Sequence, residues 1–316
     1  MYLIKGSAGL KNGHTASVVT IGNFDGVHRG HQQVIEKLAE AGRRLNLPLV
    51  VILFEPQPRE YFTLTSAPPR LMSLREKLAC LGRLPVDAVL LLRFTQKLAN
   101  LTAETFIEDI LIRQLGVRHL VVGDDFRFGL NRRGTFELLQ TYGQQHGFQV
   151  ADTPSVVCGG VRVSSTRIRE ALQQGQMTLV TELLGRTYSI QGRVIHGEKR
   201  GRTLGFPTAN VNMNRQNSAI RGVFAVTLTT PDGCDYPGVA NVGQRPTIRR
   251  GQRINLETYL FDFCGDLYGQ RVEVQFHHRI REERRFAHID ELRAQITRDA
   301  EAARNYLTNR PRESIT

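Results

Sequence analysis

The spacing of apolar residues changes near residue 185, and this change constrains the fold more than any other feature of the sequence. Before it, short apolar runs typical of buried strands alternate with segments whose apolar residues recur at helical spacing. The strand-like runs are 18–21, 49–54, 88–92, 119–123 and 148–151, and the helical segments are 32–45, 73–84, 102–115 and 136–146. This alternation predicts a doubly wound parallel sheet with ligands at the carboxyl ends of its strands.

After residue 185, strand-like segments follow one another without helices between them. They are 189–194, 222–228, 238–242, 256–261 and 271–277, with turn residues such as Pro231-Asp-Gly233 between them. This order predicts an antiparallel β-barrel. Apolar residues at helical spacing in 287–307 predict a C-terminal helix packed on it. We therefore expect two domains, 1–185 and 186–316, joined by a short helix at 177–184.

Composition and cysteine usage are those of an ordinary globular protein, with 41% hydrophobic and 23% charged residues. No apolar run approaches the roughly 20 residues of a membrane span, and the first residues lack the apolar core of a signal peptide. The cysteines, which form no CxxC pair, indicate neither a zinc site nor a disulfide framework; they are Cys80, Cys158, Cys234 and Cys264. We expect a cytoplasmic protein without a membrane partner.

The net charge of +12 is spread over both parts of the chain. A positive field favours polyanionic partners, either nucleic acid or nucleoside triphosphates. A nucleic-acid-binding protein would need aromatic residues interleaved with basic ones on a strand surface, and the sequence contains no such stretch. We therefore expect no nucleic-acid partner.

A glycine-rich turn with two histidines follows the first buried strand, in the sequence Ile21-Gly-Asn-Phe-Asp-Gly-Val-His-Arg-Gly-His31. A strand, a turn and a helix start in this order offer backbone N–H groups to phosphate. His28 and His31 could stabilise the charge of an in-line transfer at a nucleotide's phosphate, and Gly30 leaves room for a ligand between them. A lone pair of histidines would more simply be one solvated and one packed residue, but the glycines and Asp25 favour the phosphate interpretation.

Polar and aromatic residues follow the strand at 119–123. The carboxylates of Asp124 and Asp125 could orient a ribose hydroxyl or hold magnesium, or they could cap a helix or turn. The rings of Phe126 and Phe128 could form a wall against an isoalloxazine ring, or they could belong to the core. The residues alone leave both alternatives open.

A second polar segment, 163–169, stands at a predicted helix N-terminus. Its hydroxyls and guanidiniums make a strong polyphosphate site by composition. They come from Ser164, Ser165, Thr166, Arg167 and Arg169. The alternative is an N-cap with solvated arginines.

The barrel part contains one glycine-rich basic stretch, 197–210. Gly197, Gly201 and Gly205 would let the backbone approach phosphate, with Arg202 adding charge. Thr208 and Asn210 offer oxygen atoms suited to magnesium. The stretch is neither a Walker A sequence nor a protein-kinase glycine-rich loop, so a flexible basic loop is an equal alternative.

Together these segments resemble the bacterial bifunctional riboflavin kinase and FAD synthetase family. Residues 21–31 match its form of the HxGH motif, 123–129 its GDDFRFG segment and 163–169 its SSTxIR motif. Residues 201–210 match the flavokinase motif GRTxGFPTAN, and 241–247 and 256–262 match later motifs. Thr135 departs from the family, which usually has an acidic residue there. Aminoacyl-tRNA synthetases share relatives of HxGH, but their KMSKS sequence is absent.

The resemblance implies a Rossmann-like nucleotidylyltransferase domain followed by a kinase barrel with a packed C-terminal helix. The barrel would transfer the γ-phosphoryl of ATP to riboflavin, giving FMN. The first domain would then adenylylate FMN with a second ATP, giving FAD and pyrophosphate. Riboflavin, FMN, FAD and ATP are the implied ligands, with Mg²⁺ as cofactor, and self-association is left open. A nucleotidylyltransferase of another specificity with a non-catalytic barrel is the alternative.

The resemblance also implies roles for individual residues. In the adenylyltransferase site, His28 and His31 would stabilise the transition state. Nucleotide and phosphate would be bound by Gly22, Phe24, Asp25, Gly26, Ser164, Ser165, Thr166 and Arg169, and flavin by Asp125, Phe126 and Phe128.

In the kinase site, the resemblance makes Glu257 the base that takes the proton of the riboflavin 5′-hydroxyl. A lone glutamate in a strand would otherwise face solvent. The magnesium-nucleotide would be held by Thr208 and Asn210 with Gly197, Arg202 and Gly205, and flavin would be contacted by Arg281 or Arg284.

Overall fold

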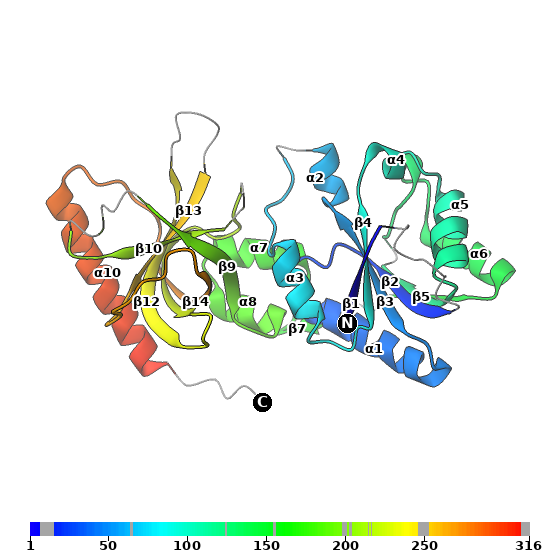
Figure 1. Cartoon of the computed structure of the whole chain (residues 1–316), viewed down its shortest axis with the longest axis horizontal. Helices are drawn as coiled ribbons and strands as arrows, with labels where there is room; N and C mark the ends of the chain where they lie inside the picture. Colours follow the sequence, from blue (N-terminus) through cyan, green and yellow to red (C-terminus); the bar gives the residue numbers. More distant parts are fainter. Residues whose placement is uncertain are drawn as a thin grey trace. The chain divides into compact units, whose positions relative to one another are not determined.

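The structure is a computed structural model of the whole chain (Figure 1). It describes residues 1–6, 16–63, 66–123, 125–153, 156–197, 201, 204–213, 215, 217–245 and 253–310. These residues form two compact units, Met1–Pro68 with Leu74–Val163 and Pro69–Ser73 with Ser164–Thr316. Residues 164–184, which the sequence assigns to the first domain, therefore pack within the second unit. The domain boundary at residue 185 stays a prediction.

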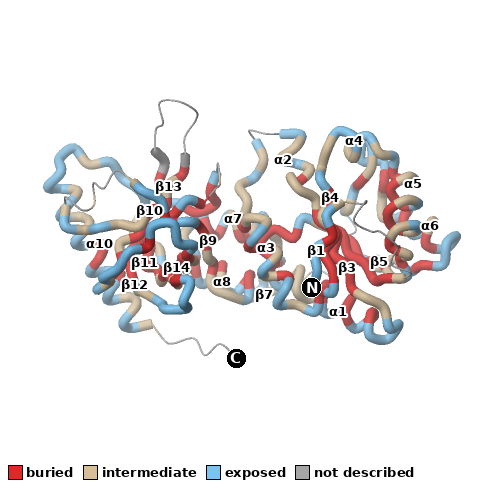
Figure 2. Tube along the Cα trace, in the orientation of Figure 1, coloured by how far each residue is buried: buried red, intermediate tan, exposed pale blue. Residues whose placement is uncertain are grey.

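The first unit is built on a six-stranded sheet of order β1-β4-β3-β2-β5-β6, and every pair in it is parallel. The strands are β1 Tyr2–Lys5, β2 Ser17–Ile21, β3 Leu49–Glu55, β4 Ala88–Arg93, β5 Val117–Val122 and β6 Gln149–Asp152. The predicted doubly wound sheet is confirmed, with β1 as an additional edge strand. Figure 2 shows buried residues concentrated in the central strands, because helices cover both faces of such a sheet.

The helices of the first unit follow the predicted alternation, with differences at their ends. They are α1 Arg29–Leu45, α2 Pro58–Phe62, α3 Leu74–Leu81, α4 Gln96–Ala99, α5 Ala103–Thr105 and α6 Phe136–His146. The predicted single helix at 102–115 is instead the short α5 continued by a π-helix, η2, over Phe106–Gln114. Its apolar residues Phe106, Ile107 and Leu111 join the core, so the spacing that predicted burial was correct although the helix type was not. A short turn, η3 Leu130–Arg132, and a small hairpin, β7 Val157–Cys158 with β8 Val161–Arg162, complete the unit.

The second unit contains a closed antiparallel barrel in the order β10-β13-β12-β11-β14-β9 (Figure 1). Its strands are β9 Tyr188–Ile195, β10 Thr208–Asn212, β11 Gly222–Thr229, β12 Asp235–Arg245, β13 Arg253–Leu260 and β14 Arg271–Arg281. The predicted barrel is confirmed. Thr208 and Asn210, at the end of the basic stretch 197–210, lie in β10 and pair with β13. Residues 198–200 and 202–203 of that stretch lie outside the described residues, so the loop alternative for them stays a prediction.

The helices that accompany the barrel in the described residues include α7 Ser165–Gln173, α8 Met177–Leu184 and α10 Ile289–Asn309. α10 packs on the outer face of β11, β12 and β14, where Ala300 and Ala303 meet Val223, Ala225 and Val239. The predicted C-terminal helix is therefore confirmed. α8 contacts β9 and β14. Arg279 of β14 donates hydrogen bonds to the carbonyls of Gln173 and Gln174 at 3.0 and 2.7 Å, which satisfies the C-terminal end of α7.

Candidate functional sites

The sheet of the first unit reverses its winding between β2 and β5. The chain moves outward from β2 through β3 to β4, and later returns to place β5 on the other side of β2. In such sheets ligands bind at the carboxyl ends of the two strands that flank this reversal. The turn at 22–28 follows β2 and the segment from 123 follows β5, so the topology brings these two predicted segments to one place.

The turn after β2 has an unusual backbone. Phe24, Gly26 and Val27 have φ angles of 45°, 88° and 40°, all in the left-handed region. A branched residue such as Val27 rarely adopts this conformation, and Val27 is also buried. Backbone strain of this kind persists where the surrounding structure enforces it, and it concentrates at ligand-binding sites.

The two histidines stack on each other, with ring centroids 3.6 Å apart and planes inclined by 14°. His28 is the N-cap of α1 and accepts a hydrogen bond from the His31 N–H at its Nδ1, at 3.4 Å. Because Nδ1 is an acceptor there, Nε2 is the ring atom of His28 that carries the proton. α1 begins at Arg29, three residues before the predicted start, so His31 lies in its first turn.

Gly30 leaves space beside the ring of His28. A Cβ at this position would lie 3.2 Å from both Cε1 and Nδ1 of that ring, closer than ordinary van der Waals contact. The sequence suggested that Gly30 makes room for a ligand. In the structure, the absence of a side chain at Gly30 instead leaves space for the His28 ring. His28 itself is only 6% exposed, and His31 packs against Phe24 at 4.8 Å between ring centroids.

After β5, Asp125 is exposed and Phe126 stacks on Phe128 with ring centroids 5.3 Å apart. Asp124 lies outside the described residues. Phe128 is 7% exposed and belongs to the core, which is the second of its two predicted alternatives. Its backbone pairs with Gly134, where a Cβ would meet the Phe128 ring at 2.7 Å. A role of these residues in flavin binding stays a prediction.

An aromatic cluster at the same edge of the sheet was missed by the sequence reasoning. Phe54 at the end of β3, Phe94 just after β4, and Tyr61 and Phe62 of α2 contact one another edge to face at 5.3–6.0 Å. Phe62 is 64% exposed, while the other three rings of the cluster are half-buried or pack against it. The pair of prolines after β3 could have indicated this cluster. Proline ends a strand, and ligands bind at the carboxyl ends of the strands in such a sheet.

The segment 164–169 forms the first turn of α7. The Ser164 hydroxyl accepts a hydrogen bond from the Arg167 N–H at 3.2 Å, which confirms the N-cap alternative for this residue. Arg169 donates from Nε to the carbonyl of Pro69 at 2.7 Å. Ser165 is half-buried and Thr166 is exposed. Phosphate binding by these residues stays a prediction.

In the barrel, a polar cluster lies on the outer face of β10 and β13. Asn210 is directly opposite Glu257 in the strand register, so both side chains point to the same face. Asn255, two residues before Glu257, donates from Nδ2 to Glu257 Oε1 at 2.7 Å and to Asn210 Oδ1 at 3.3 Å. Leu256 and Thr258 are fully buried on the opposite face. Glu257 is therefore half-buried and hydrogen-bonded rather than a freely solvated strand residue.

Asn255 was missed by the sequence reasoning, and the available signal was its spacing of two residues from Glu257 on a predicted strand. Two glycines of the basic stretch have different reasons, a close contact at Gly197 and a positive φ at Gly205. A Cβ at Gly197 would overlap the Asn210 amide, and Gly205 has a φ of 87°. Thr208 is half-buried, and Arg202 lies outside the described residues.

The two predicted flavin arginines differ in their surroundings. Arg281 forms a two-pronged ion pair with the buried Asp299 of α10, at 3.0 Å from Nε and 2.8 Å from Nη2. Arg284 is exposed and lies over the Phe286 ring at 4.5 Å. The Arg281 guanidinium thus holds α10 on the barrel, while that of Arg284 faces solvent. Flavin contact by either arginine stays a prediction.

Both halves of the chain match family models: residues 10–167 match FAD synthetase and residues 184–307 match riboflavin kinase. A bifunctional riboflavin kinase/FMN adenylyltransferase of Escherichia coli (strain K12) is 50% identical over 307 residues, which are 97% of this chain and 98% of the relative. This chain belongs to the bifunctional riboflavin kinase/FMN adenylyltransferase family. It is an enzyme of flavin cofactor synthesis, with a FAD synthetase domain followed by a riboflavin kinase domain.

A further relative agrees with this membership of the riboflavin kinase/FMN adenylyltransferase family. The enzyme of that name from Pseudomonas fluorescens is 47% identical over 304 residues, covering 96% of this chain and 97% of the relative. A crystal structure described as a macrolide-efflux protein from Streptococcus pneumoniae is 32% identical with a TM-score of 0.79, covering 96% of this chain and 98% of that one. In the part of the chain that the structure describes, no helix is long and apolar enough to cross a membrane. The predicted family, fold and bifunctional activity are confirmed.

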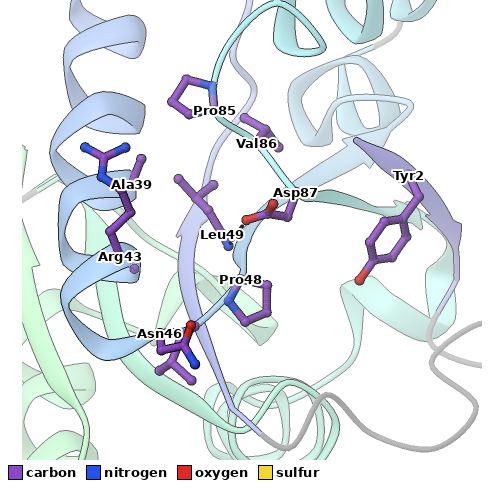
Figure 3. Close-up of a pocket in the computed structure, with 11 residues that line it drawn as sticks. Tyr2, Ala39, Arg43, Asn46, Pro48, Leu49, Pro85, Val86 and Asp87 are labelled. Carbon is purple, nitrogen blue, oxygen red and sulfur yellow. Dashed lines mark hydrogen bonds between the residues drawn. The ribbon is translucent and has the colours of Figure 1, made fainter.

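A pocket of about 620 Å³ lies at the amino ends of β1, β3 and β4 (Figure 3). Figure 3 shows Asp87 beside Leu49, whose backbone N–H donates to the carboxylate at 2.8 Å. Burial and the charge of Asp87 raise the pKa of Tyr2 above its ordinary value. The pocket is at the edge of the sheet opposite to the histidine turn and contains no residue of the candidate sites.

Proposed function

We propose that this chain makes FAD from riboflavin in two steps at separate sites, with the polar cluster around Glu257 serving the kinase and the histidine turn serving the adenylyltransferase. The observation that carries this proposal is the presence of one such constellation in each compact unit, each within the residues that match the corresponding family model. ATP is the co-substrate consistent with both families.

In the kinase step, the 5′-hydroxyl of riboflavin attacks the γ-phosphorus of ATP and the bond to the β-phosphate oxygen breaks, giving FMN and ADP. Glu257 takes the hydroxyl proton, and the hydrogen bond from Asn255 orients its carboxylate. Thr208 and Asn210 offer oxygen atoms for Mg²⁺, the hard cation that neutralises the phosphate charge in such transfers.

In the adenylyltransferase step, a phosphate oxygen of FMN attacks the α-phosphorus of a second ATP, and pyrophosphate leaves. The Nε2–H of His28 donates to the phosphoryl oxygens as charge develops, because its Nδ1 accepts from the His31 backbone. Gly22, Phe24, Asp25 and Gly26 line the turn that receives the nucleotide. The family motif adds Ser164, Ser165, Thr166 and Arg169 for the phosphates.

Flavin binding in this step is proposed for Asp125 and Phe126, with Phe128 supporting Phe126 from the core. The exposed ring of Phe62 in the aromatic cluster is a further candidate to cover an isoalloxazine ring. In the kinase step, Arg284 is the better candidate of the two arginines because Arg281 is already paired with Asp299.

The test is a chromatographic time course of riboflavin with ATP and magnesium, with the wild type and two variants. We expect FMN first and FAD second for the wild type. His28→Ala should accumulate FMN without FAD, and Glu257→Ala should make no FMN yet still adenylylate supplied FMN. Loss of both activities in either folded variant would refute separate sites. A folded wild type that neither phosphorylates riboflavin nor adenylylates supplied FMN would favour a nucleotidylyltransferase of another specificity with a non-catalytic barrel.

We also propose a cytoplasmic location and no nucleic-acid partner. The free state of Cys80, Cys158, Cys234 and Cys264 fits a reducing compartment. Self-association stays open.

A further inference from the structure

A buried lysine contacts the histidine turn from a distant part of the chain. Lys77 lies on α3 and is only 2% exposed. Its Nζ donates to the backbone carbonyl of Asn23 at 2.5 Å, across 54 residues of sequence. Leu81, one helical turn later on the same face of α3, is fully buried. α3 thus carries an ammonium group to the turn that leads to the two histidines.

Burial of an ammonium group is unfavourable unless hydrogen bonds or charges compensate for the lost water. A packing role alone would be filled better by an apolar residue of the same size, such as methionine. The presence of lysine at this fully buried position therefore calls for a reason in the turn itself.

The turn needs such support because its backbone is strained at Phe24 and Val27. Its carbonyl groups accept hydrogen bonds from within the protein: Phe24 O from the Val27 N–H at 3.2 Å and Val27 O from Gln32 Nε2 at 2.8 Å. Asn23 O accepts from Lys77. Directing the carbonyls toward protein donors keeps their negative ends away from a bound phosphate.

We propose that Lys77 is a positioning residue for FMN adenylylation: it holds the turn at Asn23 so that His28 and His31 stay aligned with the α-phosphate. This inference rests on the proposed role of that turn.

The test compares Lys77→Met with the matched control Lys37→Met in the full-length protein. Met keeps the length and volume of the lysine side chain but removes its charge and its hydrogen bond. Lys37 is an exposed lysine of α1. Steady-state FAD formation from FMN and ATP is measured together with riboflavin phosphorylation, and amide hydrogen exchange is followed over residues 22–31.

For Lys77→Met we expect kcat of FMN adenylylation to fall about 10- to 100-fold, because small displacements of catalytic groups have effects of this size. The KM for FMN should stay within about twofold, because a positioning residue acts on the chemical step rather than on flavin binding. The rate of riboflavin phosphorylation, which takes place at the separate kinase site, should also stay within about twofold. Amide exchange should become faster in residues 22–31 only, and Lys37→Met should behave like the wild type.

Two results would overturn the proposal: an unchanged kcat of adenylylation, or a fall in kcat with faster exchange throughout residues 74–163, which would mean a general loss of structure. A wild-type protein that makes no FAD would instead refute the proposed function, so the two failures are distinguishable.

Discussion

His277 should make the stability of the barrel depend on pH. It lies on β14 and is 8% exposed, with Nε2 at 2.8 Å from the Thr227 hydroxyl and Nδ1 accepting a hydrogen bond from Arg310. Burial, with the nearby charge of Arg310, lowers the pKa of His277 from 6.5 to about 3. The folded protein therefore keeps this ring neutral at pH values where the unfolded chain binds a proton.

This difference between the folded and unfolded states sets the direction in which the free energy of unfolding changes with pH. The stabilisation is fully present above the unfolded pKa of 6.5 and is lost as the pH falls toward the folded pKa of about 3. The full loss in the free energy of unfolding is at most about 5 kcal/mol, because each unit of pKa difference corresponds to about 1.4 kcal/mol. The part lost between about pH 7 and about pH 5 is about 2 kcal/mol.

The perturbation is His277→Gln, which removes the titrating ring. Urea unfolding is followed by circular dichroism at both pH values, and the change in the free energy of unfolding is compared between the variant and the wild type. We expect the wild type to lose about 2 kcal/mol more than His277→Gln on acidification. The exposed neighbour His278 provides the control, since His278→Gln should keep the wild-type pH dependence. Equal losses in His277→Gln and the wild type would refute the reasoning.

Three further substitutions test the sites and the packing of α10. Gly30→Ala should lower the rate of FAD formation about tenfold or more without affecting FMN formation, because its Cβ would press on the His28 ring; the chromatographic time course measures both. Asn255→Ala should lower kcat of riboflavin phosphorylation about tenfold by releasing the Glu257 carboxylate, and an unchanged kcat would contradict that role. Asp299→Ala should lower the free energy of unfolding by about 3 kcal/mol in urea, since it leaves a guanidinium unpaired.

The order and type of most elements could be predicted because the spacing of apolar residues records which face of a segment is buried. This succeeded for α6 at 136–146 and α8 at 177–184, whose bounds agree with the prediction. It failed for β10, because the alternation of polar and apolar residues in Thr208–Asn212 spans only five positions after a basic, glycine-rich stretch, and the segment forms a strand by pairing with β9 and β13. It also failed to predict the π-helical turns of η2, because their spacing of buried residues is close to that of an α-helix.

The sequence by itself determined the two-part architecture, the family and the segments that carry the reactive side chains. These properties depend on residue type and on spacing within short segments, which the chain order records directly. Only the tertiary structure decided that His28 and His31 stack, that Asn255 joins Glu257 to Asn210, and that Lys77 holds the turn at Asn23. Such contacts depend on strand register and helix placement, and their partners can be tens of residues apart. They form only when the whole core packs.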